Sequence, residues 1–142
     1  GTGRARQGTT RSPVWVGGGK VHTPRPRSYA KKMPLKMRRA ALRSALSAKA
    51  AENEIIVLDE LTLKEPKTKL MAQALDKISG DASVLIVIPT KNDDFKTVEL
   101  SARNLPKAKT LMVNYLNIRD LLSYDMLILP LQALDAITDH LG

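Results

Sequence analysis

Four carboxylates stand where a phosphotransfer or metal-dependent enzyme of the α/β class would place its reactive groups. Asp59 and Glu60 directly follow one short apolar run, and Asp93 and Asp94 follow another. At the carboxyl ends of parallel strands, such groups could hold Mg²⁺ or accept a phosphoryl group. Acidic residues in this position more often cap helices and contact water, and no Ser, Thr or Lys constellation accompanies these four. A nucleotide-binding or Mg²⁺-dependent phosphotransfer domain is therefore kept as an alternative hypothesis.

Other catalytic and cofactor-binding motifs are absent from the sequence. Gly19-Lys20 is followed by Val21, where a phosphate-binding loop needs Ser or Thr. The chain has no Cys, and its two His residues, His22 and His140, lie in different regions, so we expect no zinc site and no Cys–His or His–His pair. These observations predict a protein that is not an enzyme and that uses no cofactor and no metal ion.

The basic residues are unevenly distributed. Residues 1–51 hold 13 of the 23 Lys and Arg residues and none of the 14 Asp and Glu residues, so this segment carries +13 and the remainder −4. A basic segment without any acid repels itself unless a counter-charge is bound, which indicates a polyanionic partner. The longest apolar run, residues 84–88, is far too short to span a bilayer, so no membrane association is expected.

Residues 1–33 are predicted to form an extended basic Gly/Arg-rich arm. Six of the eight glycines and three of the eight prolines lie here, and the apolar residues follow no strand or helix period. The arm should therefore lack a stable structure of its own. Arginine forks suit phosphate, and aromatic rings can stack on unpaired bases. The arm offers both in Arg4, Arg6, Arg11, Lys20, Arg25, Arg27, Lys31 and Lys32, with Trp15 and Tyr29. This composition predicts nucleic-acid binding, and its irregularity favours RNA over duplex DNA.

Residues 34–142 are predicted to form one globular domain. A helix over 34–51 carries a basic stripe of Lys36, Arg39 and Arg43. The pattern then predicts strands at 55–58, 84–88, 111–113 and 126–129, which alternate with helices over 66–79, 94–104, 117–122 and 130–141. Strands that are apolar throughout are typical of parallel sheets covered by helices on both faces. The expected fold class is α/β, with a mostly parallel sheet of about four strands and right-handed crossovers.

Seven segments of the chain carry specific sequence motifs. In the arm they are 1–8 (GTGRARQG), 11–19 (RSPVWVGGG) and 24–29 (PRPRSY), and in the domain they are 36–47 (KMRRAALRSALS), 68–70, 102–105 and 124–127. Together these segments resemble the bacterial type of the large-subunit ribosomal protein "L four" family. The resemblance covers nearly the whole chain, and the arm motifs are highly specific.

This resemblance implies a structural constituent of the large ribosomal subunit that binds rRNA. The arm would be an extended loop that contributes to the nascent-peptide exit tunnel, with Gly1, Thr2, Gly3 and Arg4 at or near its tip. The rRNA-binding residues would lie in the arm and in the first helix: Arg4, Arg6, Arg11, Trp15, Lys20, His22, Arg25, Arg27, Tyr29, Lys31, Lys32, Lys36, Arg38, Arg39 and Arg43.

The resemblance also implies partners and a location. The partners would be large-subunit rRNA, neighbouring large-subunit ribosomal proteins and, near the loop tip, the nascent peptide. The protein would reside in a cytoplasmic or organellar ribosome and would not be a homo-oligomer. An alternative function of the same basic surface is autoregulatory repression, in which the free protein binds a leader in its own mRNA.

Two departures from the family pattern bear on these expectations. The family has an upstream segment with a first strand and the outgoing limb of the loop, which is absent here, and a return limb alone would not complete a tunnel loop. After the glycine triplet, members commonly have an aromatic residue and then glycine, whereas this chain has His22-Thr23. A potential stacking ring is therefore missing at that position.

Overall fold

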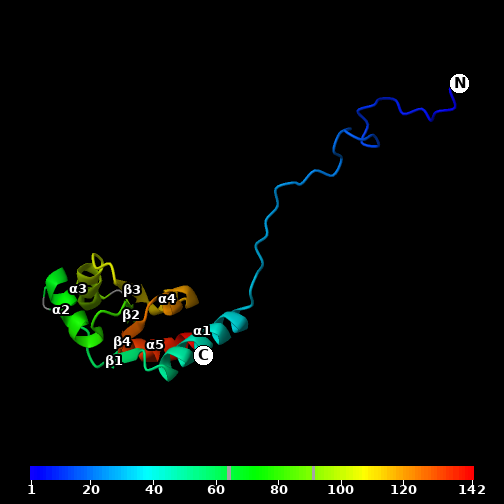
Figure 1. The fold of residues 1–142 in the computed structure, drawn as a ribbon. Coiled ribbons are helices and arrows are strands. Elements are labelled where there is room, and N and C mark those ends of the chain that lie inside the picture. The colour runs from blue at the N-terminus through cyan, green and yellow to red at the C-terminus, as the bar shows by residue number, and fades with distance from the viewer. Residues whose placement is uncertain (64, 91) are drawn as a thin grey trace. The chain divides into compact units, whose positions relative to one another are not determined.

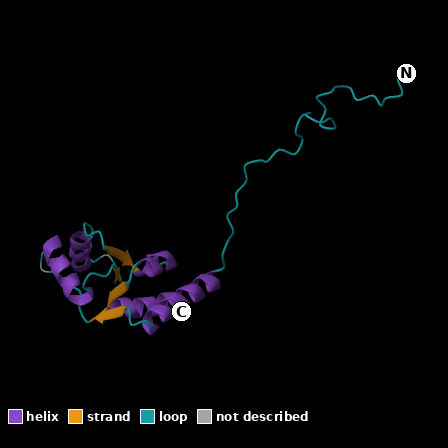
Figure 2. Ribbon diagram, viewed as in Figure 1, coloured by secondary structure: helices purple, strands orange, loops and turns teal. Residues whose placement is uncertain are grey.

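The structure is a computed structural model of the 142-residue chain, and it describes residues 1–63, 65–90 and 92–142, without the side chains of Asp93 and Asp94. It divides into two units, Gly1–Lys32 and Met33–Gly142. We refer to residues 1–32 as the arm and to residues 33–142 as the body. Residues 1–32 contain turns and bends but neither helix nor strand. The helices and strands all belong to the body (Figures 1 and 2).

The body alternates strands with helices. Its strands are β1 (Ile55–Leu58), β2 (Val84–Ile88), β3 (Ala108–Met112) and β4 (Met126–Pro130). Its helices are α1 (Leu35–Ala51), α2 (Thr68–Ser79), α3 (Asp93–Ala102), α4 (Ile118–Ser123) and α5 (Leu131–Leu141), with a short 3-10 helix, η1, at Val113–Tyr115. The strands form one sheet in the order β1-β4-β2-β3, and every neighbouring pair is parallel. The predicted α/β class with a four-stranded parallel sheet is confirmed.

Individual residues set the ends of the helices. Pro34 precedes α1, and because it has no N–H it removes one donor that the start of the helix would leave unpaired. The Asn117 side chain accepts a hydrogen bond from the Asp120 N–H at 2.8 Å and so caps α4. Gly80 ends α2 at φ 60°, a conformation that glycine adopts without steric strain. None of the helices in the described ranges is long and apolar enough to cross a membrane.

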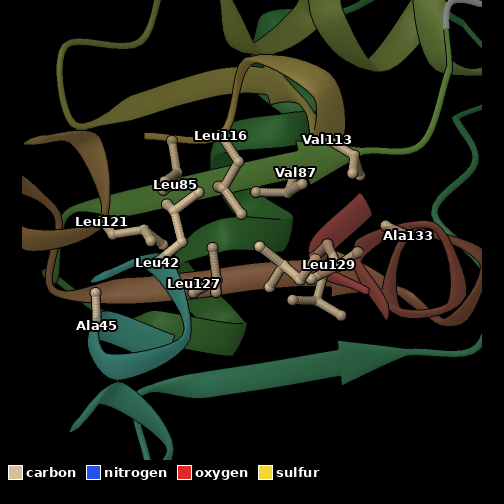
Figure 3. Packing of buried hydrophobic residues seen from close by; sticks show 12 residues of the cluster. Leu42, Ala45, Leu85, Val87, Val113, Leu116, Leu121, Leu127, Leu129 and Ala133 are labelled. Carbon is tan, nitrogen blue, oxygen red and sulfur yellow. The ribbon is translucent and has the colours of Figure 1, made fainter. Parts of the chain in front are cut away.

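Helices cover both faces of the sheet, and each face has its own core. On one face, α1, α4 and α5 pack over alternate residues of the two central strands (Figure 3), and the buried set is Leu42, Ala45, Leu85, Val87, Val113, Leu116, Leu121, Leu127, Leu129, Ala133, Ile137 and Leu141. On the other face, α2 and α3 cover Met71, Val84, Ile86, Ile88, Phe95, Val98, Ala102 and Ile128. The central strands β2 and β4 are therefore buried on both sides, as their apolar runs predicted.

The third strand differs from its predicted position. The sequence analysis placed it at 111–113, whereas β3 covers Ala108–Met112 and Val113 begins η1. The strand lies at the edge of the sheet, and all of its residues are only partly buried. An edge strand accommodates Lys109 and Thr110, so it has no continuous apolar run by which it could be recognised.

Candidate nucleic-acid interface

The arm concentrates positive charge on exposed side chains. It contains eight Lys and Arg residues and no Asp or Glu. All eight are exposed, as are His22 and the four residues predicted for the tip, Gly1, Thr2, Gly3 and Arg4. Exposed cations without internal carboxylate partners keep their full charge available to an anion from outside the chain. The predicted arm residues thus share one property, accessibility to a polyanion.

Part of the arm has a local structure that the sequence analysis did not predict. Between Thr9 and Gly19, backbone N–H groups donate to carbonyls three positions earlier, from Ser12 to Thr9, Trp15 to Ser12 and Gly18 to Trp15, at 3.3, 3.0 and 2.9 Å. Gly19 then donates to the Arg11 carbonyl at 3.0 Å. Residues 9–19 therefore form local turns, which the sequence pattern did not predict because turn formation needs no periodic apolar pattern.

A second local contact in the arm pairs a cation with a ring. The guanidinium carbon of Arg27 lies 4.7 Å from the centroid of the Tyr29 ring, a cation–π distance. Tyr29 is 77% exposed, so most of its surface remains open. The two residues, predicted separately as rRNA-binding, are thus brought together as one exposed unit with a positive charge and a flat face.

The basic residues of α1 differ in their surroundings. Lys36 and Arg38 are exposed, and Arg39 is half-buried. Arg43 is exposed, and its Nη1 donates to the Gly142 carbonyl oxygen at 3.0 Å. Of the four α1 residues predicted to bind rRNA, Lys36 and Arg38 are therefore exposed, whereas Arg39 is half-buried and Arg43 is hydrogen-bonded to the C-terminal residue of the body.

One basic residue near the end of α1 has a structural role instead. Lys49 is 6% exposed, and its Nζ lies 2.6 Å from Glu54 Oε2 and 3.0 Å from the carbonyl oxygen of Asp125. A buried ammonium group requires such partners because it has lost its hydration. Lys49 thereby joins the end of α1 to the residues that precede β1 and β4, and it is not available to a nucleic acid.

The body has a cation-rich hollow of its own. Its volume is about 790 Å³, and it lies beside the amino ends of β2 and β3 and beside α4, where it is lined by Ser83, Pro106, Lys107, Lys109, Asn117, Arg119, Asp120, Ser123 and Tyr124. Sequence reasoning missed this cluster. The sequence did contain a signal for this cluster. Lys107 and Lys109 flank the first residue of β3, and Arg119 lies in the next α-helix, α4. A parallel sheet brings such residues together at the edge where its strands begin.

Carboxylates partly neutralise this hollow. Lys109 Nζ donates to Asp120 Oδ1 at 2.7 Å, and Asn117 donates to Asp120 Oδ2 at 2.8 Å. The hydrogen bond from Lys109 is the main reason that the pKa of Asp120 lies below its ordinary value, and burial opposes the effect. Lys107 is paired with Asp81. Two of the three cations are thus already compensated inside the body, unlike those of the arm.

Hydrogen bonds between the amino ends of β2 and β4 lie next to this hollow. The carboxylate of Asp125 accepts hydrogen bonds from the hydroxyl and the N–H of Ser83 at 2.7 and 2.9 Å. Both bonds favour the charged carboxylate and lower the pKa of Asp125. Asp125 therefore serves the sheet rather than an external ligand.

The alternative phosphotransfer site gains no support from the described residues. Asp59 and Glu60 are both exposed, and both follow β1. The side chains of Asp93 and Asp94 lie outside the described part of the structure. Among the residues that are described, no three His, Asp or Glu side chains are close enough together to hold a metal ion.

Comparisons with known proteins agree with the resemblance noted in the sequence. The model of the ribosomal protein L4/L1 family matches residues 1–140. Proteins named large ribosomal subunit protein uL4 are similar along nearly the whole chain: that of Thermoanaerobacter sp. strain X514 is 51% identical over 98% of this chain, and that of Lactobacillus acidophilus is 50% identical over 100%. The chain spans about two thirds of the length of these relatives, 66% and 67%. By family match and by identity, the chain belongs to the ribosomal protein L4/L1 family.

Proposed function

We propose that this protein is a structural, non-catalytic constituent of the large ribosomal subunit and that it binds large-subunit rRNA mainly through the arm. The observation that carries the proposal is a segment of 32 residues with eight exposed cations and no acid. Relatives with about 50% identity over nearly the whole chain are named as large-subunit proteins, and these names support rRNA as the polyanion that the arm binds.

The affinity of the arm for rRNA would come chiefly from the release of counterions. Each phosphate that a Lys or Arg side chain neutralises releases condensed cations, so binding weakens as salt rises. Arginine adds bidentate hydrogen bonds to phosphate oxygens. Glycines and prolines between the cations prevent a helix, so the arm can follow an irregular RNA surface. On this proposal, the arm cations, His22, Trp15 and Tyr29 all contact rRNA.

The body would position the arm and make smaller contacts of its own. Helix α1 is the first element of the body after the arm sequence, and its exposed cations Lys36 and Arg38 would extend the rRNA contact from the arm. The hollow with Lys107, Lys109 and Arg119 would contribute less, because Asp120 and Asp81 compensate two of its charges. Other surfaces of the body would contact neighbouring ribosomal proteins in the cytoplasmic ribosome.

The arm terminus is assigned a place by the family resemblance. Residues Gly1, Thr2, Gly3 and Arg4 would lie at or near the tip of a loop that lines the nascent-peptide exit tunnel. They are exposed and small, apart from Arg4, so they suit a narrow passage between RNA and a moving peptide. Crosslinking from position 2 to a stalled nascent chain would test this part of the proposal separately.

The main experiment compares two variants with the same change in net charge. One replaces Arg4, Arg6, Lys20 and Arg25 of the arm with Gln, and the other replaces the exposed body residues Lys69, Lys77, Lys96 and Arg103 with Gln. Binding to protein-free large-subunit rRNA from Lactobacillus acidophilus is measured at several salt concentrations. Each lost phosphate contact reduces the salt slope of log K by about 0.7–0.9, so the arm variant should lose about 3.

The body variant is the control for non-specific effects of charge. Its salt slope should stay within about 1 of the parent value, because its four cations lie on α2, on α3 and directly after α3, away from the arm sequence. If the two variants lost equal amounts of salt slope, rRNA binding would depend only on the net charge of the protein and not on the arm, and the proposal would be contradicted. An unchanged slope in the arm variant would contradict it as well.

A further inference from the structure

The arm residues from Thr9 to Gly18 form three consecutive turns rather than a featureless chain. In each turn a backbone N–H donates to the carbonyl three positions earlier, and the donors are Ser12, Trp15 and Gly18. Trp15 therefore uses its N–H in one turn and its carbonyl in the next. Its backbone is held from both sides by hydrogen bonds of 3.0 and 2.9 Å.

The residue types match the positions that these turns require. In the turn from Ser12 to Trp15, Ser occupies the first position and Pro13 the second, which are favoured places for both. In the turn from Trp15 to Gly18, Gly17 occupies the third position with φ +79°. A positive φ at this position defines a type II turn and favours glycine. Sequence and geometry thus agree on both turns that involve Trp15.

Gly18 leaves no room for any side chain. A Cβ at this position would lie 2.0 Å from the carbonyl oxygen and 2.8 Å from the carbonyl carbon of Ser12, which are backbone atoms that cannot move unless the turn opens. The next glycine differs, since a Cβ on Gly19 would lie 3.7 Å from the Arg11 carbonyl oxygen, an ordinary contact. The two adjacent glycines therefore provide a matched pair, one essential to the turn and one replaceable by Ala.

Trp15 is less exposed than its neighbours in the turn. Trp15 is 43% exposed, whereas the neighbours Val14 and Val16 are 78% and 105% exposed. A large part of the surface of Trp15 nevertheless remains open. An aromatic ring of this kind offers a flat face to which a base can stack, whatever the base.

We infer that the turn of residues 9–19 is a preformed platform on which Trp15 stacks against an unpaired rRNA base. The inference rests on the proposed function, because it names a recognition element within the rRNA-binding arm. A platform that is ordered before binding loses less conformational entropy on binding than a flexible segment would. Gly18 is then a positioning residue, and Trp15 is the contact residue.

The first test examines the free protein, and the single Trp of the chain makes it specific. Trp15 fluorescence and its quenching by acrylamide are measured for the full chain and for Gly18→Ala and Gly19→Ala. Gly18→Ala should shift the emission to the red and increase quenching, because opening the turn exposes the indole, and Gly19→Ala should match the parent. Identical spectra and quenching for the three proteins would overturn the preformed turn.

The second test measures affinity for the same protein-free large-subunit rRNA. Trp15→Ala should weaken binding about tenfold, within the range for loss of one stacked base, without changing the salt slope. Trp15→Phe should retain most of the affinity, and Gly18→Ala should weaken binding more than Gly19→Ala. If Trp15→Ala bound the rRNA as tightly as the parent, Trp15 would not stack on an rRNA base, and the inference would be overturned. This outcome can be told apart from failure of the proposed function. If only the stacking role fails, the parent protein still binds rRNA with a clear salt dependence, whereas if the proposed function fails, the parent shows no such salt-dependent binding.

Discussion

The arm and the body of this protein are held together by different kinds of contact. In the arm, most hydrogen bonds join residues two or three positions apart, and every side chain except Ser12 is exposed. In the body, β2 pairs with β4 so that Val84 aligns with Met126, and side chains such as Leu85 and Leu127 are almost wholly buried. Burial of apolar surface stabilises the body, whereas turn geometry shapes the arm. Mutations can therefore affect the stability of one unit without affecting the other.

Charge separates the two units in the same way. Residues 1–32 hold eight cations and no carboxylates, whereas residues 33–142 hold 15 cations and 14 carboxylates. Several body cations are paired internally, among them Lys49 with Glu54 and Lys109 with Asp120. The body satisfies much of its charge within itself, and the arm leaves all of its charge for a partner. Stability and RNA affinity should therefore be separable by mutation.

The largest effect is expected from removing a central side chain of the body. Leu127 is 0% exposed in β4, so Leu127→Ala leaves a cavity and should lower the free energy of unfolding by about 2–5 kcal/mol. Urea unfolding followed by far-UV circular dichroism measures the change. Trp15 emission without denaturant should stay at the parent value, because the turn of residues 9–19 has its own hydrogen bonds.

Leu122→Ala is the matched control for this prediction. Leu122 is 68% exposed on α4, so its truncation should change the free energy of unfolding by less than about 0.5 kcal/mol. A change in Trp15 emission in Leu127→Ala alone would mean that the turn depends on the body core, and the separation of the two units would fail.

The next effect is expected where α1 is fixed to the sheet. Lys49→Ala removes both the ion pair with Glu54 and the hydrogen bond to the Asp125 carbonyl. Because the side chain of Glu54 is 30% exposed, water can partly replace the lost ammonium group, and the loss should be about 2 kcal/mol in the free energy of unfolding. The same urea experiment measures it. The double variant Lys49→Met with Glu54→Gln should recover part of the free energy of unfolding that Lys49→Ala loses. If the double variant were instead less stable than Lys49→Ala, the ion pair would not be the cause of the loss.

Much of the body could be predicted from the sequence because its signals are local or periodic. The apolar runs at 84–88 and 126–129 predicted β2 and β4, and Asn117 and Gly80 correctly marked a helix start and a helix end. The ends of the predicted helices were displaced by up to two residues, since helix ends depend on tertiary contacts as well as on residue type. Strand β3 was displaced further, because an edge strand lacks a continuous apolar run.

The candidate interface was predicted in part. Its cations and rings follow from composition, since charge without acids is visible in any sequence. The turn around Trp15 was not predicted, although Pro13 and Gly17 occupy positions that β-turns favour, because a β-turn produces no helix or strand period in the sequence. The hollow at Lys107, Lys109 and Arg119 was missed because only the topology of the sheet brings these residues together.

A smaller effect is expected at Asp120, and it should depend on pH. Its pKa in the folded protein is lowered, chiefly by the hydrogen bond from Lys109, so the unfolded chain binds a proton more readily than the folded chain. The carboxylate therefore stabilises the fold above about pH 5, and this contribution disappears as the pH falls through the lowered pKa. Asp120→Asn should reduce the free energy of unfolding by about 1 kcal/mol at pH 7 and by clearly less near pH 3.

Urea unfolding at the two pH values measures this difference. The exposed residue Asp139 on α5 provides the control, since Asp139→Asn should change the free energy of unfolding by less than about 0.5 kcal/mol at pH 7. A loss in Asp120→Asn that is equal at both pH values would assign the effect to packing rather than to the charged hydrogen bond with Lys109.

The smallest effect concerns α1, where the two units meet along the chain. Lys36 is exposed, whereas the guanidinium of Arg43 already donates to the Gly142 carbonyl at 3.0 Å. If α1 extends the rRNA contact of the arm, Lys36→Gln should lower the salt slope of log K by about 0.7–0.9, which corresponds to one phosphate. Arg43→Gln should lower it by less, because a phosphate must compete with the carbonyl for the same donor. Salt titration of rRNA binding compares the two variants, and a larger change for Arg43→Gln than for Lys36→Gln would contradict a contact at the first turn of α1.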